Sequence, residues 1–210
     1  MSRVRQSDYY WYTCSFIFLF CTVGAAQNNG RFDEAKRAGM SLVQGEQYDR
    51  AAGRLEEVWE QDHSDLSVGE FLALAYLNTE DRRALPQNQT QAFAIIKELT
   101  SKGGRVSFIV LHSHEKGLLG GHELSQYCRG RLSILDHHLI FVADKGEKAG
   151  QHSFDVTAKD FKSASFHEGD ERGTFNISLN SGSYFMATRN RNRDEARLIV
   201  NLVRQGLGGK

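Results

Sequence analysis

Three histidines near the middle of the chain have the residue type and spacing that metal chemistry requires. His112, His114 and His122 lie within eleven residues, and Glu115 and Glu123 follow two of them directly. Since alternate residues of a β-strand share one face, the first two imidazoles could reach one ion. Three histidines around an ion with one open position could activate water. A secreted metal-dependent hydrolase is therefore the alternative function, although this spacing is far less specific than a helical H-E-x-x-H motif, and metal binding stays open.

Other catalytic constellations are weaker in this sequence. Cys128 could act as a nucleophile only beside a base, and at an inward-facing strand position a cysteine is more often a buried thiol. The sequence contains no G-x-S-x-G motif, no P-loop and no glycine pattern for dinucleotides. We therefore predict a protein that is not an enzyme and uses no cofactor.

A basic cluster stands just before the last predicted helix. Arg189, Arg191 and Arg193 could bind an anion or a phospholipid headgroup there. Peripheral membrane contact thus stays open, although a solvated loop is the more common explanation for such a run. The whole chain has 26 basic and 26 acidic residues, so its formal charge is zero. Because nucleic-acid binding depends on positive charge, we predict no nucleic-acid partner.

Residues 1–26 have the pattern of a secretory signal peptide. An apolar stretch at 14–23 follows two arginines and ends in small residues, so cleavage is expected after Ala25 or Ala26. The alternative is an uncleaved membrane anchor, because 9–26 is just long enough to span a bilayer. We predict a secreted or periplasmic protein whose mature chain keeps a single cysteine and forms no internal disulfide.

The rest of the chain divides into two halves with different periodicities. In 31–103, apolar residues recur at steps of three and four, which is typical of amphipathic helices. In 104–207, short β-rich runs alternate with polar turns, and a helical pattern follows over Arg193–Leu207. Hydrophobic residues make up 40% and charged residues 25% of the chain, which excludes disorder throughout. We predict an α+β protein with a boundary at Gly103–Gly104 and strands at Val106–Leu111, Arg131–Leu135, His138–Val142, His152–Val156, Thr174–Leu179 and Tyr184–Thr188.

The helical half repeats itself with a period of 34 residues. Gly39 and Ala73 are separated by this interval, and the residues flanking them repeat with it. The period and the small residues at Gly39 and Ala51 resemble the tetratricopeptide-repeat family. The resemblance implies paired helices that approach closely at the small residues. The second unit departs from the family pattern, because its second helix is delayed by a loop at 82–88. The alternative is a set of plain helical hairpins whose periodicity arose by chance.

That resemblance also implies a concave surface on the first helix of each unit, where a protein or peptide partner would bind. Projected onto this chain, the surface comprises Ser41, Gln44, Glu70 and Leu74. Two repeats are fewer than a solenoid needs for stability. The open end of the helices is therefore expected to pack on the β-rich half or on a partner chain.

The β-rich half resembles the pleckstrin-homology-like fold in the order of its elements. Several short strands precede one amphipathic helix, and 128–134 matches the strand pattern C-x-G-x-L-x-I. A hairpin is expected at 174–188, where asparagine and glycine favour a tight turn. The resemblance implies a bent sheet whose open corner is closed by the helix. Another small barrel or sandwich with a terminal helix is the alternative.

Together these features predict a non-catalytic, exported binding or scaffold protein. The helical hairpins and the pleckstrin-homology-like domain would both contact a protein or peptide partner. The identity of that partner and the oligomeric state are left open by the sequence.

Overall fold

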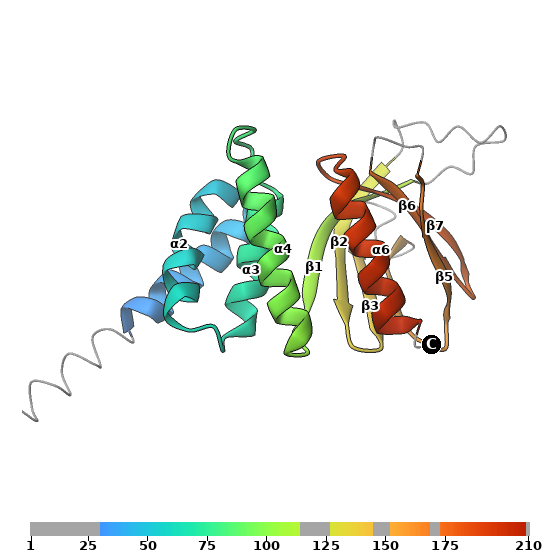
Figure 1. The fold of residues 1–210 in the computed structure, drawn as a ribbon, viewed down its shortest axis with the longest axis horizontal. Helices are drawn as coiled ribbons and strands as arrows, with labels where there is room; N and C mark the ends of the chain where they lie inside the picture. Colours follow the sequence, from blue (N-terminus) through green and yellow to red (C-terminus); the bar gives the residue numbers. More distant parts are fainter. Residues whose placement is uncertain (1–29, 114–126, 145–151, 169–172, 209–210) are drawn as a thin grey trace, which may run out of the picture.

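The computed structural model describes residues 30–113, 127–144, 152–168 and 173–208. It contains a helical half, a seven-stranded antiparallel sheet and a last helix that lies beside the sheet (Figure 1). This mixed architecture is the predicted α+β fold class. The predicted signal segment 1–26 lies outside the described residues. Within the described residues, no helix is both long enough and apolar enough to cross a membrane.

The helical half consists of a helix at residues 30–44 followed by α2 (Tyr48–Gln61), α3 (Leu66–Leu77) and α4 (Leu85–Ser101). Nearly every residue of α3 is buried, whereas α2 and α4 each bury one face. This occurs because α2 and α4 pack on α3 and strand β1 (Val106–Ser113) covers another side. A helix that is apolar all round requires such complete cover.

The segment between α3 and α4 is 78–84, so α4 begins at Leu85, inside the loop predicted at 82–88. Pro86 stands in the first turn of that helix. The missing N–H of a proline costs nothing at this position, since the first backbone donors of a helix have no partner within it. The proline therefore lies in the first turn of the helix, and the prediction that it stands in the loop before the helix was wrong.

The small residues of the repeat lie inside the helical half. A Cβ atom on Gly39 would stand 2.6 Å from the side chain of Leu55, so the helix at 30–44 approaches α2 closely at this point. Ala51 and Ala73 are also buried, at 0% and 2% exposure. The expectation that these residues avoid solvent is confirmed, whereas the tetratricopeptide relationship itself stays a prediction.

The sheet has the strand order β4-β3-β2-β1-β7-β6-β5. Strand β1 pairs with β2 on one side and with β7 on the other, so the first strand of the sheet is also its centre. Every predicted strand overlaps an observed one. The strands that follow β1 are β2 (Tyr127–Leu135), β3 (His138–Ala143), β4 (Phe154–Thr157), β5 (Phe161–Phe166), β6 (Thr174–Leu179) and β7 (Gly182–Thr188).

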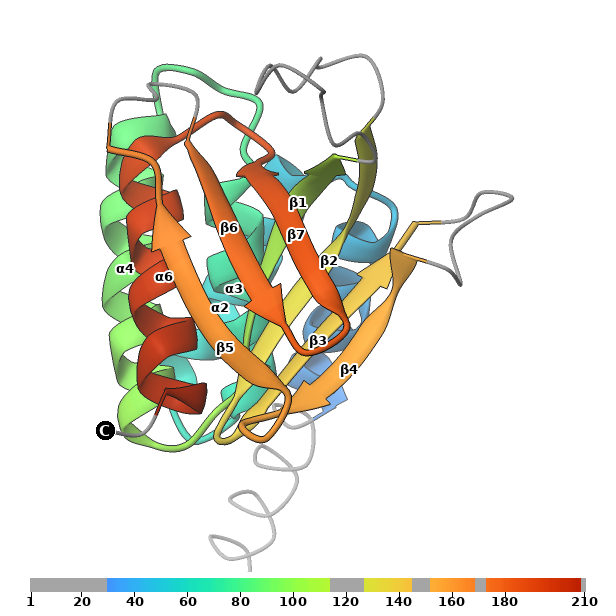
Figure 2. The ribbon, with the colours of Figure 1, turned by 90° about the vertical axis from the view of Figure 1, so that its right-hand side faces the viewer.

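The last helix, α6 (Arg193–Leu207), packs against the sheet and lies beside β5 (Figure 2). The side chain of Asn192 caps its first turn by accepting a hydrogen bond of 2.9 Å from the Glu195 N–H. Near its other end, Arg204 Nε donates to the Ala164 carbonyl at 2.8 Å and so covers the free edge of β5. This strand order and terminal helix agree with the predicted pleckstrin-homology-like arrangement.

The chain changes from helix to strand where the sequence predicts it. α4 ends at Ser101 and β1 begins at Val106, on either side of Gly103–Gly104. Buried apolar residues nevertheless form one cluster that includes both halves. The two halves therefore share a core, although their secondary structure differs.

The close approach at Gly39 generates a test of helix packing. We expect Gly39→Val to lower the free energy of unfolding by about 1–3 kcal/mol, because the added methyl groups overpack the contact with Leu55. The matched control is Gly53→Val on α2, where an added Cβ meets nothing within 4 Å. Urea denaturation followed by circular dichroism would measure both. Equal losses in the two variants would contradict the close approach.

Glu195 generates a test of pH dependence. Its side chain is buried in the first turn of α6, and burial raises its pKa from 4.5 to about 8. A raised folded-state pKa stabilises the protein fully below pH 4.5, and this contribution is lost as the pH rises through about 8. The free energy of unfolding of the unaltered protein should fall by about 3 kcal/mol between pH 5 and pH 8 because Glu195 ionises, and Glu195→Gln should not show this fall. Thermal unfolding of both proteins across this range would measure it, and parallel pH profiles would contradict the burial of a titrating carboxyl group.

Candidate functional site

The junction between the two halves is built around strand β1. Ser107 faces α3, because its hydroxyl donates to the Glu70 carboxylate at 2.6 Å. His112, at an even position of the strand, instead packs in the sheet interior against Phe141 at a ring distance of 5.9 Å. Since alternate residues of a strand point to opposite faces, β1 serves the helical half with one face and the interior of the bent sheet with the other.

Glu70 is the charged centre of this junction, at 3% exposure. Arg105 Nε lies 2.9 and 2.8 Å from its two carboxylate oxygens, and Ser107 adds a third hydrogen bond. The hydroxyl groups of Ser107 and Ser133 are 2.8 Å apart, which extends the network to β2. A buried carboxylate is tolerated because it is paired and hydrogen-bonded in this way.

Two of the four predicted partner-binding residues lie in this junction. Glu70 and Leu74 are 3% and 1% exposed, and Ser107 of β1 hydrogen-bonds to Glu70, so the surface predicted to be concave and open is covered at these positions. Ser41 and Gln44 are exposed on the helix at 30–44. The structure therefore does not bring the four residues together on one accessible surface, because the end of the helical half packs on the sheet.

Arginines of the β-rich half reach across to the helices. Arg129 pairs with both oxygens of Glu46, and this hydrogen bond holds the pKa of the Glu46 carboxyl below its ordinary value. The Arg131 guanidinium lies 5.5 Å from the centre of the Phe71 ring. These contacts attach the outer face of β2 to the helical half by charge and by stacking on an aromatic ring.

Amide side chains join the beginnings of α4 and α6. Gln89 and Asn192 exchange two hydrogen bonds, each of 3.0 Å. Asn190 Nδ2 donates to the Leu77 carbonyl at 2.6 Å, at the end of α3. These contacts place the two helices side by side at their N-terminal ends, as Figure 1 shows.

A cavity of about 310 Å³ opens at the opposite end of the same pair of helices. Both halves line it: the last turn of α4 and the glycines after it, the start of β1, the turn between β2 and β3, and the last turns of α6. Its buried apolar wall comprises Val106, Ile134 and Leu202. The remaining lining residues are Thr100, Gly103, Gly104, Leu135, Asp136, Gln205 and Gly206. The cavity exists only because the two halves are docked.

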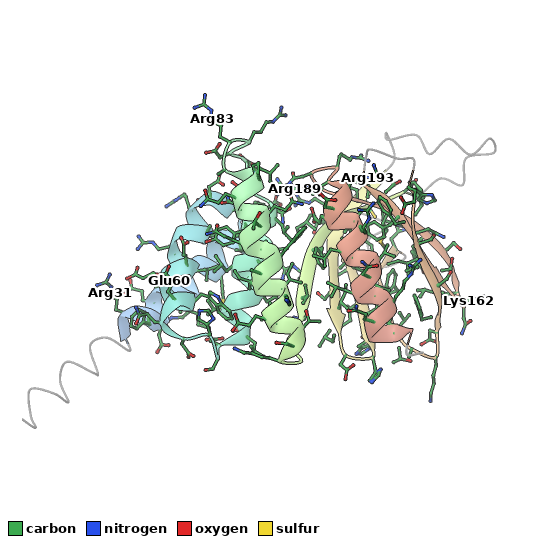
Figure 3. All side chains as sticks on the ribbon, viewed as in Figure 1. Arg31, Glu60, Arg83, Lys162, Arg189 and Arg193 are labelled. Atoms are coloured by element: carbon green, nitrogen blue, oxygen red, sulfur yellow. The ribbon has the colours of Figure 1, made fainter. Side chains whose placement is uncertain are left out.

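The predicted anion-binding arginines do not converge. Arg189 lies 4.8 Å above the Tyr48 ring, on the side of the helical half. Arg193 donates to the Glu168 carbonyl at 2.6 Å and lies over Phe166, on the side of β5. Figure 3 shows Arg189 between the two halves and Arg193 at the start of α6. Arg191 stands between them with a positive φ of 54°. The anion site stays a prediction, and these contacts direct two of its three side chains to different neighbours.

The predicted histidine site is not assembled in the described part of the chain. His114 and His122 lie outside the described residues. Among the residues that are described, no group of three histidine, cysteine or acidic side chains could hold a metal ion. His112 Nδ1 instead lies 3.6 Å from Cys128 Sγ, because the two residues are paired across β1 and β2. Burial raises the pKa of the Cys128 thiol, which disfavours a nucleophilic thiolate.

Sequence reasoning missed several residues that meet in the structure. The rings of His152 and Tyr184 lie 5.5 and 5.4 Å from that of His112, although the three residues come from distant segments. The cavity residues Asp136 and Leu202 were not singled out either. The sequence signal near the cavity was the glycines at the ends of α4 and α6, which predict where these helices end, because glycine commonly follows a helix C-terminus.

No family model matches this sequence, and no curated protein matches it. Some solved structures are similar to it in part. The pleckstrin-homology domain of human oxysterol binding protein-related protein 11 has a TM-score of 0.35 and 13% identity, over 51% of this chain and 88% of that one. The C-terminal domain of an unknown protein from Leishmania infantum has a TM-score of 0.33 and 19% identity, over 55% and 96% of the two chains. The linker-DH/PH domains of p115-RhoGEF have a TM-score of 0.38 and 9% identity, over 88% and 72%. Similarities of this size carry no information on function.

The buried ion pair generates a test of the junction. We expect Arg105→Ala to lower the free energy of unfolding by about 2–4 kcal/mol, because it leaves the Glu70 carboxylate buried without its cation. The matched control is Arg31→Ala, whose partner Glu57 is itself 40% exposed, and its loss should stay below about 1 kcal/mol. Chemical denaturation would measure both variants. A similar small loss in each would contradict a structural role for the buried pair.

Proposed function

We propose that this chain is a non-catalytic binding protein that holds a protein or peptide partner where its helical half meets its β-rich half. The observation that carries this proposal is the cavity of about 310 Å³, whose walls come from both halves. Ligand sites are commonly concave, largely apolar and located between structural units. Occupation of this cavity would involve residues of α4, β1 and α6 at once, and it would therefore depend on an intact junction.

The lining of the cavity supports binding rather than catalysis. Asp136 is the one titratable residue among the described residues that line it, and its side chain is 77% exposed. The Thr100 hydroxyl donates to the Ile96 carbonyl of its own helix. An activated nucleophile needs a base within hydrogen-bonding distance, and the lining residues supply no such pair.

Two finer features belong to the same proposal. The pattern of residues 1–26 supports export to the cell exterior or the periplasm. The close packing at Gly39 supports a relationship of the helical half to tetratricopeptide repeats. The partner-binding surface nevertheless differs from that of an open repeat array, since β1 covers Glu70 and Leu74.

A bulky residue at the rim of the cavity tests this function. Thr100 is an exposed residue of α4 whose replacement by tryptophan would fill the opening. We expect Thr100→Trp to lose a partner that the unaltered full chain captures from native extract, with unchanged thermal stability. The measurement is quantitative affinity capture with both proteins immobilised at equal density.

The matched control is Thr90→Trp. Thr90 is also an exposed threonine of α4, and its hydroxyl likewise donates to the carbonyl four residues earlier, at 3.0 Å. It does not line the cavity. Thr90→Trp should capture the partner as the unaltered chain does. Retention by Thr100→Trp, or loss by both variants, would overturn the proposed location of binding.

A further inference from the structure

We infer that the cavity accepts a basic side chain of the partner protein, with lysine as the residue that suits it best. This inference rests on the proposed function and adds the chemistry of the group that is bound. Three features support it: the charge of the cavity rim, the apolar wall below the rim, and the contacts that the nearby basic residues of this chain make with other groups.

The rim is electronegative because two helices end there. The last turns of α4 and α6 both contribute to the lining, through Thr100 on one side and Gln205 and Gly206 on the other. The C-terminus of a helix carries roughly half a negative elementary charge. Two such ends at one cavity favour a cation, although the Gly206 carbonyl already accepts a hydrogen bond of 3.2 Å from the His137 N–H. The carboxylate of Asp136 adds negative charge at the same rim.

The wall below the rim is apolar and suits a hydrocarbon stem. Val106, Ile134 and Leu202 form it and are 2%, 6% and 8% exposed in total. A lysine side chain buries its methylene groups against apolar surface while its ammonium group stays at a polar rim. The cavity volume of about 310 Å³ lies at the small end of ligand sites, which fits a single side chain better than a large ligand.

Most of the basic residues nearest in sequence to the lining are engaged elsewhere, whereas His137 lies beside the rim carboxylate, with its Nε2 3.4 Å from Asp136 Oδ1. Lys102 Nζ donates to the His63 carbonyl at 2.8 Å and to Glu98 Oε1 at 2.7 Å. Arg105 pairs with Glu70, and Arg204 donates to the edge of β5. None of the described residues that line the cavity is basic. Since the side chains of His137 and Asp136 are 73% and 77% exposed, their contact is weak, and the rim is available to a cation from another molecule.

Three blocked tripeptides that differ in one side chain test this inference. They are acetyl-Gly-Lys-Gly-amide, its norleucine counterpart with a similar stem and no charge, and its glutamate counterpart. Each is titrated into the full chain, labelled with ¹⁵N, and amide chemical shifts are followed. The lysine peptide should bind saturably, about three- to tenfold more tightly than the norleucine peptide, and should shift amides of cavity residues. The glutamate peptide should not bind.

Variants connect this binding to the cavity. Asp136→Asn keeps a residue suited to the turn and should weaken lysine-peptide binding about threefold, without affecting the norleucine peptide. Thr100→Trp should abolish binding. Asp33→Asn removes the same charge from the exposed surface of the helix at 30–44 and should change nothing.

Several results would overturn the inference. These are no saturable binding of the lysine peptide, equal affinity for the lysine and norleucine peptides, or an unchanged affinity in Asp136→Asn. Binding of hexylammonium without binding of the lysine peptide would identify a free amine as the ligand and reject a partner side chain. If Thr100→Trp loses the captured partner but Asp136→Asn retains it fully, the proposed function stands and the assignment of a cationic group fails.

Discussion

A carboxylate with 3% exposure imposes the main constraint on this molecule. Glu70 lies in the middle of α3, and its charge is tolerated only where Arg105 and Ser107 reach it together. Both partners belong to the beginning of the β-rich half, so the first strand of the sheet must lie against the third helix. An isolated helical half would expose the apolar side of α3 and leave this carboxylate without its cation. The two halves are therefore held together by a buried ion pair as well as by a shared core.

That constraint determines which surface of the helices stays open. A repeat array leaves its concave face open, whereas here the corresponding surface is occupied by β1. The docking also places α4 and α6 side by side in the same direction, with their first turns joined through Gln89 and Asn192 and their last turns at one cavity. Parallel helices concentrate like partial charges at each end. At the N-terminal ends of α4 and α6, the side-chain amides of Gln89 and Asn192 bond to each other within the chain. The cavity lies at the C-terminal ends, where the partial charges of the helices are negative, whereas the predicted arginine site is positive.

Local patterns predicted the elements well, and contacts between distant segments were the part that the sequence did not reveal. Small residues at Gly39 and Ala51 predicted close helix contacts, because only small side chains permit them. Glu70 was misinterpreted since a single acidic residue on a helix is ordinarily exposed. The surrounding sequence LSVGEFLALAYL argued against exposure of Glu70, because a helix that is apolar on all sides must be covered on all sides. The meeting of His112, Cys128 and His152 depends on strand register and on the path of the chain around the sheet, which residue spacing does not specify.

The cavity differs from the other polar clusters of the molecule in how its charge is paired. Glu70 and Arg105, Arg129 and Glu46, and Gln89 and Asn192 are complementary pairs, and each satisfies its charge or its hydrogen bonds within the chain. Such pairs hold the halves together but attract nothing further. Among the described residues that line the cavity none is a lysine or an arginine, and the basic group beside Asp136 is the exposed imidazole of His137, at 3.4 Å. Two helix ends and one carboxylate add to the same sign of charge at this rim. The charge at this end of the junction is therefore less completely paired within the chain than that of the three clusters named above.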